Sequence, residues 1–376
     1  MAAATWDAIT WTVAGILLVF TLRRLLFWFA SCLPGRENAA DRGTSIVVIV
    51  AARNEQRLLP RLLAALAKSD YPEHLLHFVL VSDASTDATP ALIERWCAAH
   101  ANARAVVLTE AHGKSRALAA GLAAAPASDL AVMMDADTEP VPDALAWLAG
   151  TFADSRVGGV CGYPEPRNAL VSVTSRYAAL ERWVYHLVLL AGKDRLGLNP
   201  PVIGNICAFR RKALDSIGGF PWDPAGEDIR VSMLLVKAGW RTRWVRRAVT
   251  REDVTTRFGG FRAQRTRWSR GMLGNAGKAS NLETLLVAAG YLDRLAMVAA
   301  VALTLAGRMP VAIVAAALAA PALTVVTALF RARASRKLSI LWSIVPMFFA
   351  DVAVTAASAA AQVAGVRPKW AARQTE

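Results

Sequence analysis

Two carboxylates placed two positions apart, Asp135 and Asp137, follow a run of five apolar residues, Leu130–Met134. Such a run predicts a strand buried on both faces of a parallel sheet, and ligands bind beyond the carboxyl ends of these strands. In extended chain the two side chains point to the same side, and they repel each other unless a cation is near. The pair therefore indicates a Mg²⁺ or Mn²⁺ site beside a phosphate, with a solvated acidic turn as the alternative.

Polar residues also follow two earlier apolar runs. The segment 45–51 leads into Arg53 and Glu55, and the segment 76–82 leads into Asp83. Because parallel strands end at the same edge of a sheet, these side chains are expected to share one crevice with Asp135. A carboxylate at Asp83 is placed to accept an N–H from a nucleotide base. Asp87, four residues later, is expected to cap the following helix instead.

Lys114 begins a predicted helix directly after Gly113. A helix start offers backbone N–H groups to an anion, and the lysine adds a positive charge. The alternative is a solvated helix start without a ligand.

These residues need a scaffold of alternating strands and helices, which the apolar pattern predicts. Strands are expected at 45–51, 76–82, 105–108 and 130–134, and helices at 58–66, 87–99, 114–124 and 142–152. This alternation is typical of an α/β fold with a mostly parallel sheet and helices on both faces. From about residue 155 it stops, and the predicted elements are an amphipathic helix at 170–191, a strand at 206–210, a helix at 229–238, a strand at 241–246 and a basic, aromatic segment at 257–273.

The composition favours a chain that is partly in a membrane. Of 376 residues 55% are hydrophobic, and the formal net charge is +14. The basic residues gather beside apolar spans and near the predicted site, which favours a membrane surface and phosphate over nucleic acid. No nucleic-acid-binding motif is present. Four widely separated cysteines give neither a zinc motif nor a disulfide framework, so a reducing, cytosol-facing body is expected.

Apolar segments near both ends predict membrane spans. The segment 8–33 predicts an uncleaved anchor with its amino end outside, and the segments 285–306 and 309–330 predict a hairpin. The basic loop 331–337 is expected in the cytoplasm. The segment 338–364 predicts a further span, or a helix in the membrane interface. The expected organisation is an anchor at 1–33, a cytosolic domain with interface helices at 34–280, and two or three spans at 281–376.

Four signatures occur in order along the chain: Asp83, the pair Asp135 and Asp137, the pair Glu227 and Asp228, and the segment Gln264-Arg265-Thr266-Arg267-Trp268. With them, residues 45–275 resemble family 2 glycosyltransferases, which are inverting enzymes with a GT-A fold. The pattern is most similar to the membrane-bound branch of cellulose, chitin, hyaluronan and poly-N-acetylglucosamine synthases and their lipid-glycosylating relatives. The resemblance implies a hexosyltransferase that uses a UDP-sugar.

The resemblance also implies roles for individual residues. Asp228, beside Glu227, is the expected catalytic base, because the attacking hydroxyl must lose a proton. Asp137, with Asp135, is the expected ligand of Mg²⁺ or Mn²⁺. The expected nucleotide-binding residues are Ala51, Arg53, Glu55, Asp83, Lys114, Asp135 and Arg267, and the expected acceptor-binding residues are Gly204, Asn205, Gln264 and Trp268.

The chain departs from the family pattern in two motifs, and some residues have simpler explanations. Arg53 stands where the family usually has tyrosine, and Ser82 and Ala84 stand where it usually has aspartate and glycine. Glu227 and Asp228 are also suitable for a helix N-terminus. Trp268 is also suitable as an interfacial anchor. The arginines around it, Arg262 and Arg270, are also suitable for binding lipid headgroups.

The predicted reaction is transfer of a sugar to a lipid or lipid-linked glycan at the cytoplasmic face of a bacterial inner membrane, because the membrane portion is small. The alternatives are a processive polysaccharide synthase and an inactive scaffold or anionic-lipid-binding protein. The sequence leaves the sugar and the oligomeric state open.

Overall fold

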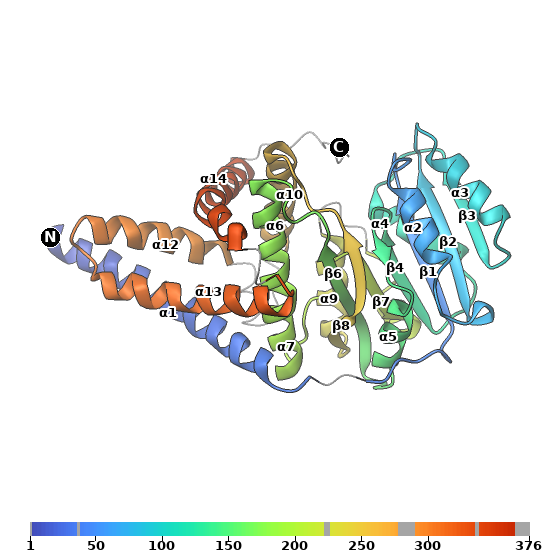
Figure 1. Ribbon diagram of the computed structural model, residues 1–376, viewed down its shortest axis with the longest axis horizontal. Helices are drawn as coiled ribbons and strands as arrows, with labels where there is room; N and C mark the ends of the chain where they lie inside the picture. The colour runs from blue at the N-terminus through green and yellow to red at the C-terminus, as the bar shows by residue number, and fades with distance from the viewer. Residues whose placement is uncertain (1, 36–37, 222–225, 277–289, 335–337, 365–376) are drawn as a thin grey trace. The chain divides into compact units, whose positions relative to one another are not determined.

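The computed structural model describes residues 2–35, 38–221, 226–276, 290–334 and 338–364 (Figure 1). The first residues of the predicted span 285–306, the basic residues 336 and 337, and the carboxyl-terminal tail lie outside this part. The chain forms two compact units. The sheet unit comprises Gly35–Asn168 and Gly197–Val254, and the helical unit comprises Met1–Pro34, Ala169–Leu196 and Thr255–Gln374.

Among the described residues, eight strands form one mixed sheet in the sheet unit, in the order β3-β2-β1-β4-β7-β6-β8-β5. Their bounds are β1 Ile46–Ala52, β2 Leu76–Asp83, β3 Ala103–Leu108, β4 Leu130–Asp135, β5 Glu139–Pro140, β6 Val157–Pro166, β7 Ile206–Arg210 and β8 Arg241–Glu252. Strands β1 to β4 are mutually parallel. Ala51 of β1 lies opposite both Val81 of β2 and Asp135 of β4, so the predicted polar strand ends share one edge.

Helices cover both faces of this sheet, as predicted. Their bounds are α2 Leu59–Leu66, α3 Thr89–Ala98, α4 Lys114–Ala124, α5 Ala144–Thr151, α8 Arg211–Ser216 and α9 Glu227–Lys237, and a short 3₁₀ turn, η1, spans Glu73–Leu75. Helices α2, α3 and α5 pack with Ile46, Val48 and Val50 in one hydrophobic core. Helix α4 covers the opposite face, because a Cβ at its Gly121 would lie 2.6 Å from the Ile49 side chain.

The sheet differs from the prediction in its second half. Strand β7 is antiparallel to both β4 and β6, and β5 is antiparallel to β8. Strand β6 was not predicted, because its sequence Val-Gly-Gly-Val-Cys-Gly-Tyr has three glycines and no polar alternation. The glycines are needed for packing: a Cβ at Gly162 would lie 2.3 Å from the carbonyl oxygen of Ala248 in β8.

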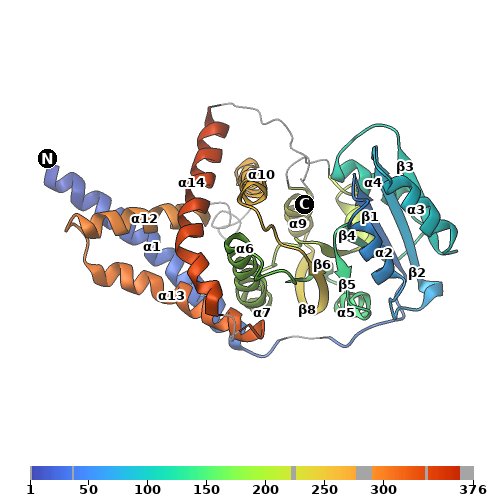
Figure 2. The same ribbon diagram turned by 45° about the horizontal axis from the view of Figure 1, so that its top comes forward.

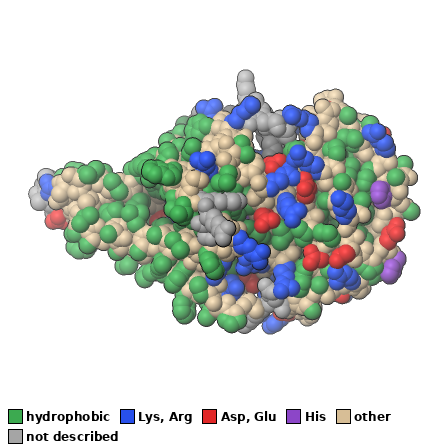
Figure 3. All heavy atoms as spheres, viewed as in Figure 1, with side chains coloured by type: hydrophobic (Ala, Val, Ile, Leu, Met, Phe, Trp, Pro, Cys, Tyr) green, Lys and Arg blue, Asp and Glu red, His purple; other side chains and the backbone are tan. Residues whose placement is uncertain are grey.

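The helical unit contains α1 Ala2–Cys32, α6 Val173–Val184, the π-helical segment η2 Tyr185–Leu190, α7 Ala191–Leu196, α10 Phe258–Ala276, α12 Gly290–Leu305, α13 Val311–Arg331, the 3₁₀ segment η3 Leu338–Ser343 and α14 Ile344–Val363. Helices α1, α12 and α13 lie together, and α14 crosses their direction (Figure 2). The three share a core that includes Leu17, Ala300 and Ala317. Their outer side chains are largely hydrophobic, and on the face seen in Figure 3 few charges interrupt them.

Three helical segments among the described residues are long and apolar enough to cross a membrane: Thr5–Cys32, Val311–Arg331 and Leu338–Gln362. The first corresponds to the predicted anchor, and the second to the second segment of the predicted hairpin. The third corresponds to the segment 338–364, for which the sequence predicts either a span or an interfacial helix. The described part of α12 has 16 residues, fewer than the roughly 20 that a span needs.

Candidate active site

Asp83, at the end of β2, is buried and organises the loop that precedes α4. Its two carboxylate oxygens accept hydrogen bonds from the backbone N–H groups of His112 and Gly113, at 2.8 and 2.9 Å. Gly113 has φ +82°, a value that favours glycine. Through these bonds Asp83 sets the position of Lys114, the first residue of α4.

Lys114 joins two of the predicted signatures. Its ammonium nitrogen lies 2.7 Å from Oδ1 of Asp135 and 3.0 Å from Oε1 of Glu227. Burial works against the charge of Lys114, but the neighbouring carboxylates of Asp135 and Glu227 raise its pKa well above the usual value. The contacts from Asp83 through this lysine therefore bring the first three of the four predicted signatures into one place.

Asp228 follows Glu227 in the first turn of α9, the position that the helix-cap explanation required. Its side chain accepts a hydrogen bond from the N–H of Ile229 at 2.8 Å. Burial, and then the charge of Glu227, raise the pKa of Asp228 to about 6, while Lys114 acts in the opposite direction. A carboxylate with this pKa is better suited to accept a proton near neutral pH than an ordinary aspartate.

Asp137 lies two residues beyond Asp135 and is half-buried. Among the described residues, no three His, Cys, Asp or Glu side chains gather in a way that could hold a metal ion. Two carboxylates nevertheless fit a hard divalent ion that takes its remaining oxygen ligands from substrate phosphates and water. The donor set is therefore compatible with Mg²⁺ or Mn²⁺, and it does not distinguish between them.

The loop after β1 carries the predicted residues Arg53, which is exposed, and Glu55, which is half-buried. The N–H of Glu55 donates to Thr89 at 2.8 Å. Asn54 has φ +56°, and its side chain accepts a hydrogen bond from the N–H of Thr86 at 2.8 Å. Asp87 accepts from the N–H of Thr89 at 2.9 Å, but the N-cap position of α3 is Ala88, so Asp87 binds the first residue of the helix from one position before the expected cap. These bonds tie the loops after β1 and β2 together.

Asn205, predicted at the acceptor site, immediately precedes β7 and is buried. Its side-chain amide donates to Oε2 of Glu252 at 2.8 Å and accepts from the hydroxyl of Thr250 at 3.0 Å. Its carbonyl oxygen accepts from the N–H of Asp135 at 3.1 Å. Gly204 precedes it with φ +109°. Asn205 thus contacts the segment of the predicted metal ligands through its backbone, while its side chain is held by residues of β8.

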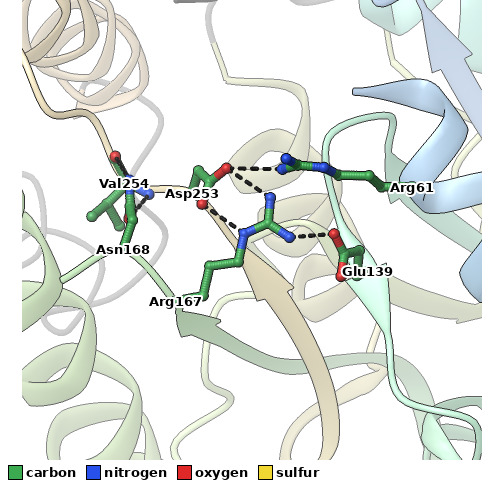
Figure 4. Close-up of polar contacts among 6 residues, drawn as sticks. All are labelled: Arg61, Glu139, Arg167, Asn168, Asp253 and Val254. Atoms are coloured by element: carbon green, nitrogen blue, oxygen red, sulfur yellow. Dashed lines mark hydrogen bonds and ion pairs between the residues drawn. The ribbon is translucent and has the colours of Figure 1, made fainter. Parts of the chain in front are cut away.

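An ion-pair cluster follows the Asp135–Asp137 segment directly (Figure 4). The guanidinium of Arg167 contacts both oxygens of Asp253, at 2.6 and 2.7 Å, and also binds Glu139 of β5. Arg61 of α2 reaches the same Asp253 at 3.3 Å. Hydrogen bonding to Arg167 holds the pKa of Asp253 below its usual value. The cluster connects the ends of β6 and β8 to Glu139, which follows the predicted metal ligands in the sequence.

The remaining predicted residues, Gln264, Arg267 and Trp268, lie on α10 in the helical unit. Arg267 is exposed, whereas Gln264 and Trp268 are half-buried. The Trp268 ring has two guanidinium groups as neighbours: the carbon of Arg265 lies 5.1 Å from its centroid and that of Arg182 lies 5.7 Å away. Their part in a nucleotide or acceptor site remains a prediction.

Sequence reasoning missed Glu252, the partner of Asn205, and Arg265, which is buried at the centre of an ion-pair network in the helical unit. For Glu252 the available signal was its place at the end of an arginine-rich strand in which less polar residues recur between the charges. For Arg265 it was the occurrence of charges inside apolar segments, since Asp351 and Arg294 interrupt two of them.

Comparison with known proteins identifies the family and the fold of this chain. Residues 43–271 match the family described as "Glycosyltransferase like family 2". A probable glycosyltransferase of Bacillus subtilis, YdaM, is 26% identical over 63% of the chain and 57% of its own length. An N-acetylglucosaminyltransferase of Rhizobium leguminosarum is 29% identical over 72% of the chain and 65% of its own length.

Two further similarities extend this comparison. A poly-beta-1,6-N-acetyl-D-glucosamine synthase of Staphylococcus epidermidis is 28% identical over 60% of the chain and 54% of its own length. The chain thus covers less than two thirds of these curated relatives. Among solved structures, the mannosyltransferase PcManGT of Pyrobaculum calidifontis, in complex with GDP-Man and Mn²⁺, has a TM-score of 0.65 and 24% identity, and the match covers 95% of this chain and 98% of that one.

The solved structure supports the GT-A fold predicted from the sequence, and the family match extends over most of the chain, as the resemblance implied. Because the family match covers more than half of the chain, the chain belongs to the family 2 glycosyltransferases.

Proposed function

We propose that the protein transfers a sugar from a UDP-sugar to a lipid or lipid-linked glycan, with inversion at the anomeric carbon. The observation that carries this proposal is the double contact of Lys114 with Asp135 and Glu227. This contact supports the proposal because it joins the end of β4, which carries the proposed metal ligand Asp135, the start of α4 and the acidic pair of α9. Relatives named N-acetylglucosaminyltransferase make UDP-N-acetylglucosamine the first donor to test.

In this proposal Asp83 holds the loop that receives the nucleotide, while Lys114 binds its diphosphate. Ala51, Arg53, Glu55 and Arg267 are the further nucleotide-binding residues. Asp137 and Asp135 would hold Mg²⁺ or Mn²⁺, which supplies positive charge to the departing diphosphate. Binding of the diphosphate by Lys114 would release its contact with Glu227, leaving the acidic pair of α9 next to the acceptor.

Asp228 is the proposed base. It must be ionised to accept the proton of the acceptor hydroxyl, and it must lie opposite the leaving group in an in-line displacement. Gly204, Asn205, Gln264 and Trp268 are the proposed acceptor contacts. An aromatic ring such as Trp268 offers an apolar face to a sugar ring, and Gln264 offers both a donor and an acceptor.

The proposed location is a bacterial inner membrane, with the sheet unit in the cytoplasm. Three helices long enough to span a membrane support membrane insertion. Arg331 is the last residue of α13, and Arg333 lies just beyond it. These two basic residues support a cytoplasmic position for that end of the helix.

The test is release of UDP by the purified protein in lipid nanodiscs, with a panel of UDP-sugars, with and without Mn²⁺ or Mg²⁺. Asp137→Asn should abolish metal-dependent turnover. Asp228→Asn should retain UDP binding and lose transfer. Asp215→Asn, at a side chain that is 59% exposed, is the matched control and should behave as wild type. Absence of turnover with every UDP-sugar, or full activity of Asp228→Asn, would contradict the proposal.

A processive polysaccharide synthase is the second candidate, favoured by the relative named poly-beta-1,6-N-acetyl-D-glucosamine synthase. Mass spectrometry of the product formed in native membranes separates the two. A single or short addition to a lipid supports the first proposal, and a ladder of long chains supports the second.

A further inference from the structure

The helical unit contains four charged residues, from four helices, that contact one another. Glu181 comes from α6, Arg265 from α10, Arg294 from α12 and Asp351 from α14, and we call them the interhelical quartet. Arg265 binds both Glu181 and Asp351, the latter at 3.2 Å. Arg294 binds the same two carboxylates, Glu181 at 3.1 Å. Two positive and two negative charges therefore alternate, and their sum is zero.

Asp351 is the most buried member of the quartet. Its side chain has no exposed surface, and the hydroxyl of Tyr177 in α6 donates to it at 3.4 Å. It interrupts a helix that is otherwise strongly apolar. Burying a carboxylate is costly, and well-packed apolar residues usually stabilise helix contacts at least as well as a buried ion pair. The quartet is therefore better explained by the geometry it imposes than by stability.

Helix α14 contacts α10 along a polar stripe that begins at Asp351. Thr355 and Ser358, one and two turns further along, are also buried, and the hydroxyl of Ser358 donates to the carbonyl oxygen of Thr266 at 3.4 Å. These positions recur at the spacing that places side chains on one face of a helix. The stripe thus holds α10 at Arg265 and at Thr266, the second and third residues of its Gln264–Trp268 segment.

Arg265 connects the quartet to Trp268. The two residues are three positions apart on α10, so their side chains are neighbours. The guanidinium carbon of Arg265 lies 5.1 Å from the centre of the Trp268 ring and 4.8 Å from that of Phe261. A cation held in place by two carboxylates restricts the orientation of an aromatic ring against which it packs.

We propose that Asp351 and Arg265 are positioning residues: through the interhelical quartet they set the orientation of the Trp268 ring and so the affinity for the acceptor. This inference rests on the proposed function in one respect, the role of Trp268 as an acceptor contact. It assigns a part in acceptor recognition to α14, a helix that contributes none of the predicted site residues.

The experiment compares Asp351→Asn with wild type in nanodiscs, with octyl β-D-glucoside as the acceptor probe and the UDP-sugar that wild type hydrolyses best. Asp351→Asn should raise the apparent KM for the glucoside about tenfold. The KM for the UDP-sugar and its acceptor-free hydrolysis should stay within about twofold of wild type. Asp351→Glu should restore most of the affinity. Asp7→Asn, at an exposed aspartate of α1, is the matched control.

A second variant and a spectroscopic measurement keep the test independent of folding and of turnover. Arg265→Lys retains the charge but removes the planar group beside Trp268, and should raise the same KM. In protein labelled with 5-fluorotryptophan, the ¹⁹F signal missing from Trp268→Phe belongs to Trp268. Asp351→Asn and Arg265→Lys should shift or broaden that signal, whereas Asp7→Asn should not.

An unchanged Trp268 signal in both variants would overturn the positioning role, whether or not the protein turns over any UDP-sugar. A changed signal with an unchanged glucoside KM would overturn the link to acceptor affinity. Equal losses of acceptor-free hydrolysis and of transfer would also overturn it, because they would indicate general damage. Absence of UDP release by wild type would refute the proposed function alone, and the ¹⁹F signal would still decide whether the quartet orients Trp268.

Discussion

Replacing Asp228 by asparagine is expected to stabilise the fold while it removes the proposed base. In the folded chain, burial and the neighbouring Glu227 raise the pKa of Asp228 to about 6, from an unperturbed value of 3.8. Between these two values the folded state binds more protons than the unfolded state. Stability therefore falls as pH rises through this window, and the full penalty is present above pH 6.

The difference of about two pKa units corresponds to about 3 kcal/mol at pH 7.5. Asparagine carries no charge at any pH, so the variant should recover up to this amount at pH 7.5 and almost none at pH 4. For a domain of this size each kcal/mol shifts Tm by about 2–4 °C. A rise of about 6–12 °C is therefore the upper limit expected at pH 7.5.

The assay is thermal unfolding of the solubilised protein at several pH values, for wild type and Asp228→Asn. Asp154→Asn is the control of opposite sign in the same unit. The side chain of Arg156 lowers the pKa of Asp154 to about 2, so its ionised form stabilises the fold and is lost only as pH falls towards 2. This variant should be slightly less stable than wild type at pH 7.5. A Tm difference for Asp228→Asn that is negative, or equal at pH 4 and pH 7.5, would refute the reasoning.

Three further outcomes are expected. The acidic limb of the pH–rate profile should have its midpoint near pH 6. Lys114→Met should move this midpoint to higher pH, because the positive charge of Lys114 favours the ionised base, and it should also raise the KM for the UDP-sugar. An unchanged midpoint in this variant would contradict the prediction. Asp83→Asn should weaken UDP binding about tenfold in calorimetry, since it removes one of two acceptors for the loop before α4; unchanged affinity would exclude a role for that loop. Gly192→Ala should destabilise the helical unit by about 1–3 kcal/mol, because the added Cβ would lie 2.1 Å from a backbone carbonyl oxygen of α1. Gly15→Ala is the control and should be neutral in the same thermal assay, because no atom lies within 4 Å of its added Cβ.

Local sequence was a good guide wherever burial repeats along the chain. The apolar run before Asp135 predicted strand β4 to within one residue, and the predicted bounds of α4 agree with the structure. Prediction failed for β6, because its glycines are set by contacts with residues far along the chain, such as Ala248. It also left open whether residues 338–364 span the membrane, because length and hydropathy are the same for a span and for an apolar interfacial helix.

The sequence by itself was sufficient to predict the family, because the order of the carboxylates along the chain can be read without knowing the distances between them in space. Only the tertiary structure decided which charges meet. The pairing of Lys114 with both Asp135 and Glu227, and of Asp351 with Arg265, depends on where the sheet and the helices bring distant segments together. The hydrophobic periodicity of a sequence indicates which residues are buried. An ion pair of this kind, in contrast, requires two residues that are far apart in the chain to lie close together in space. The proposed base and the proposed positioning of Trp268 both depend on such pairs.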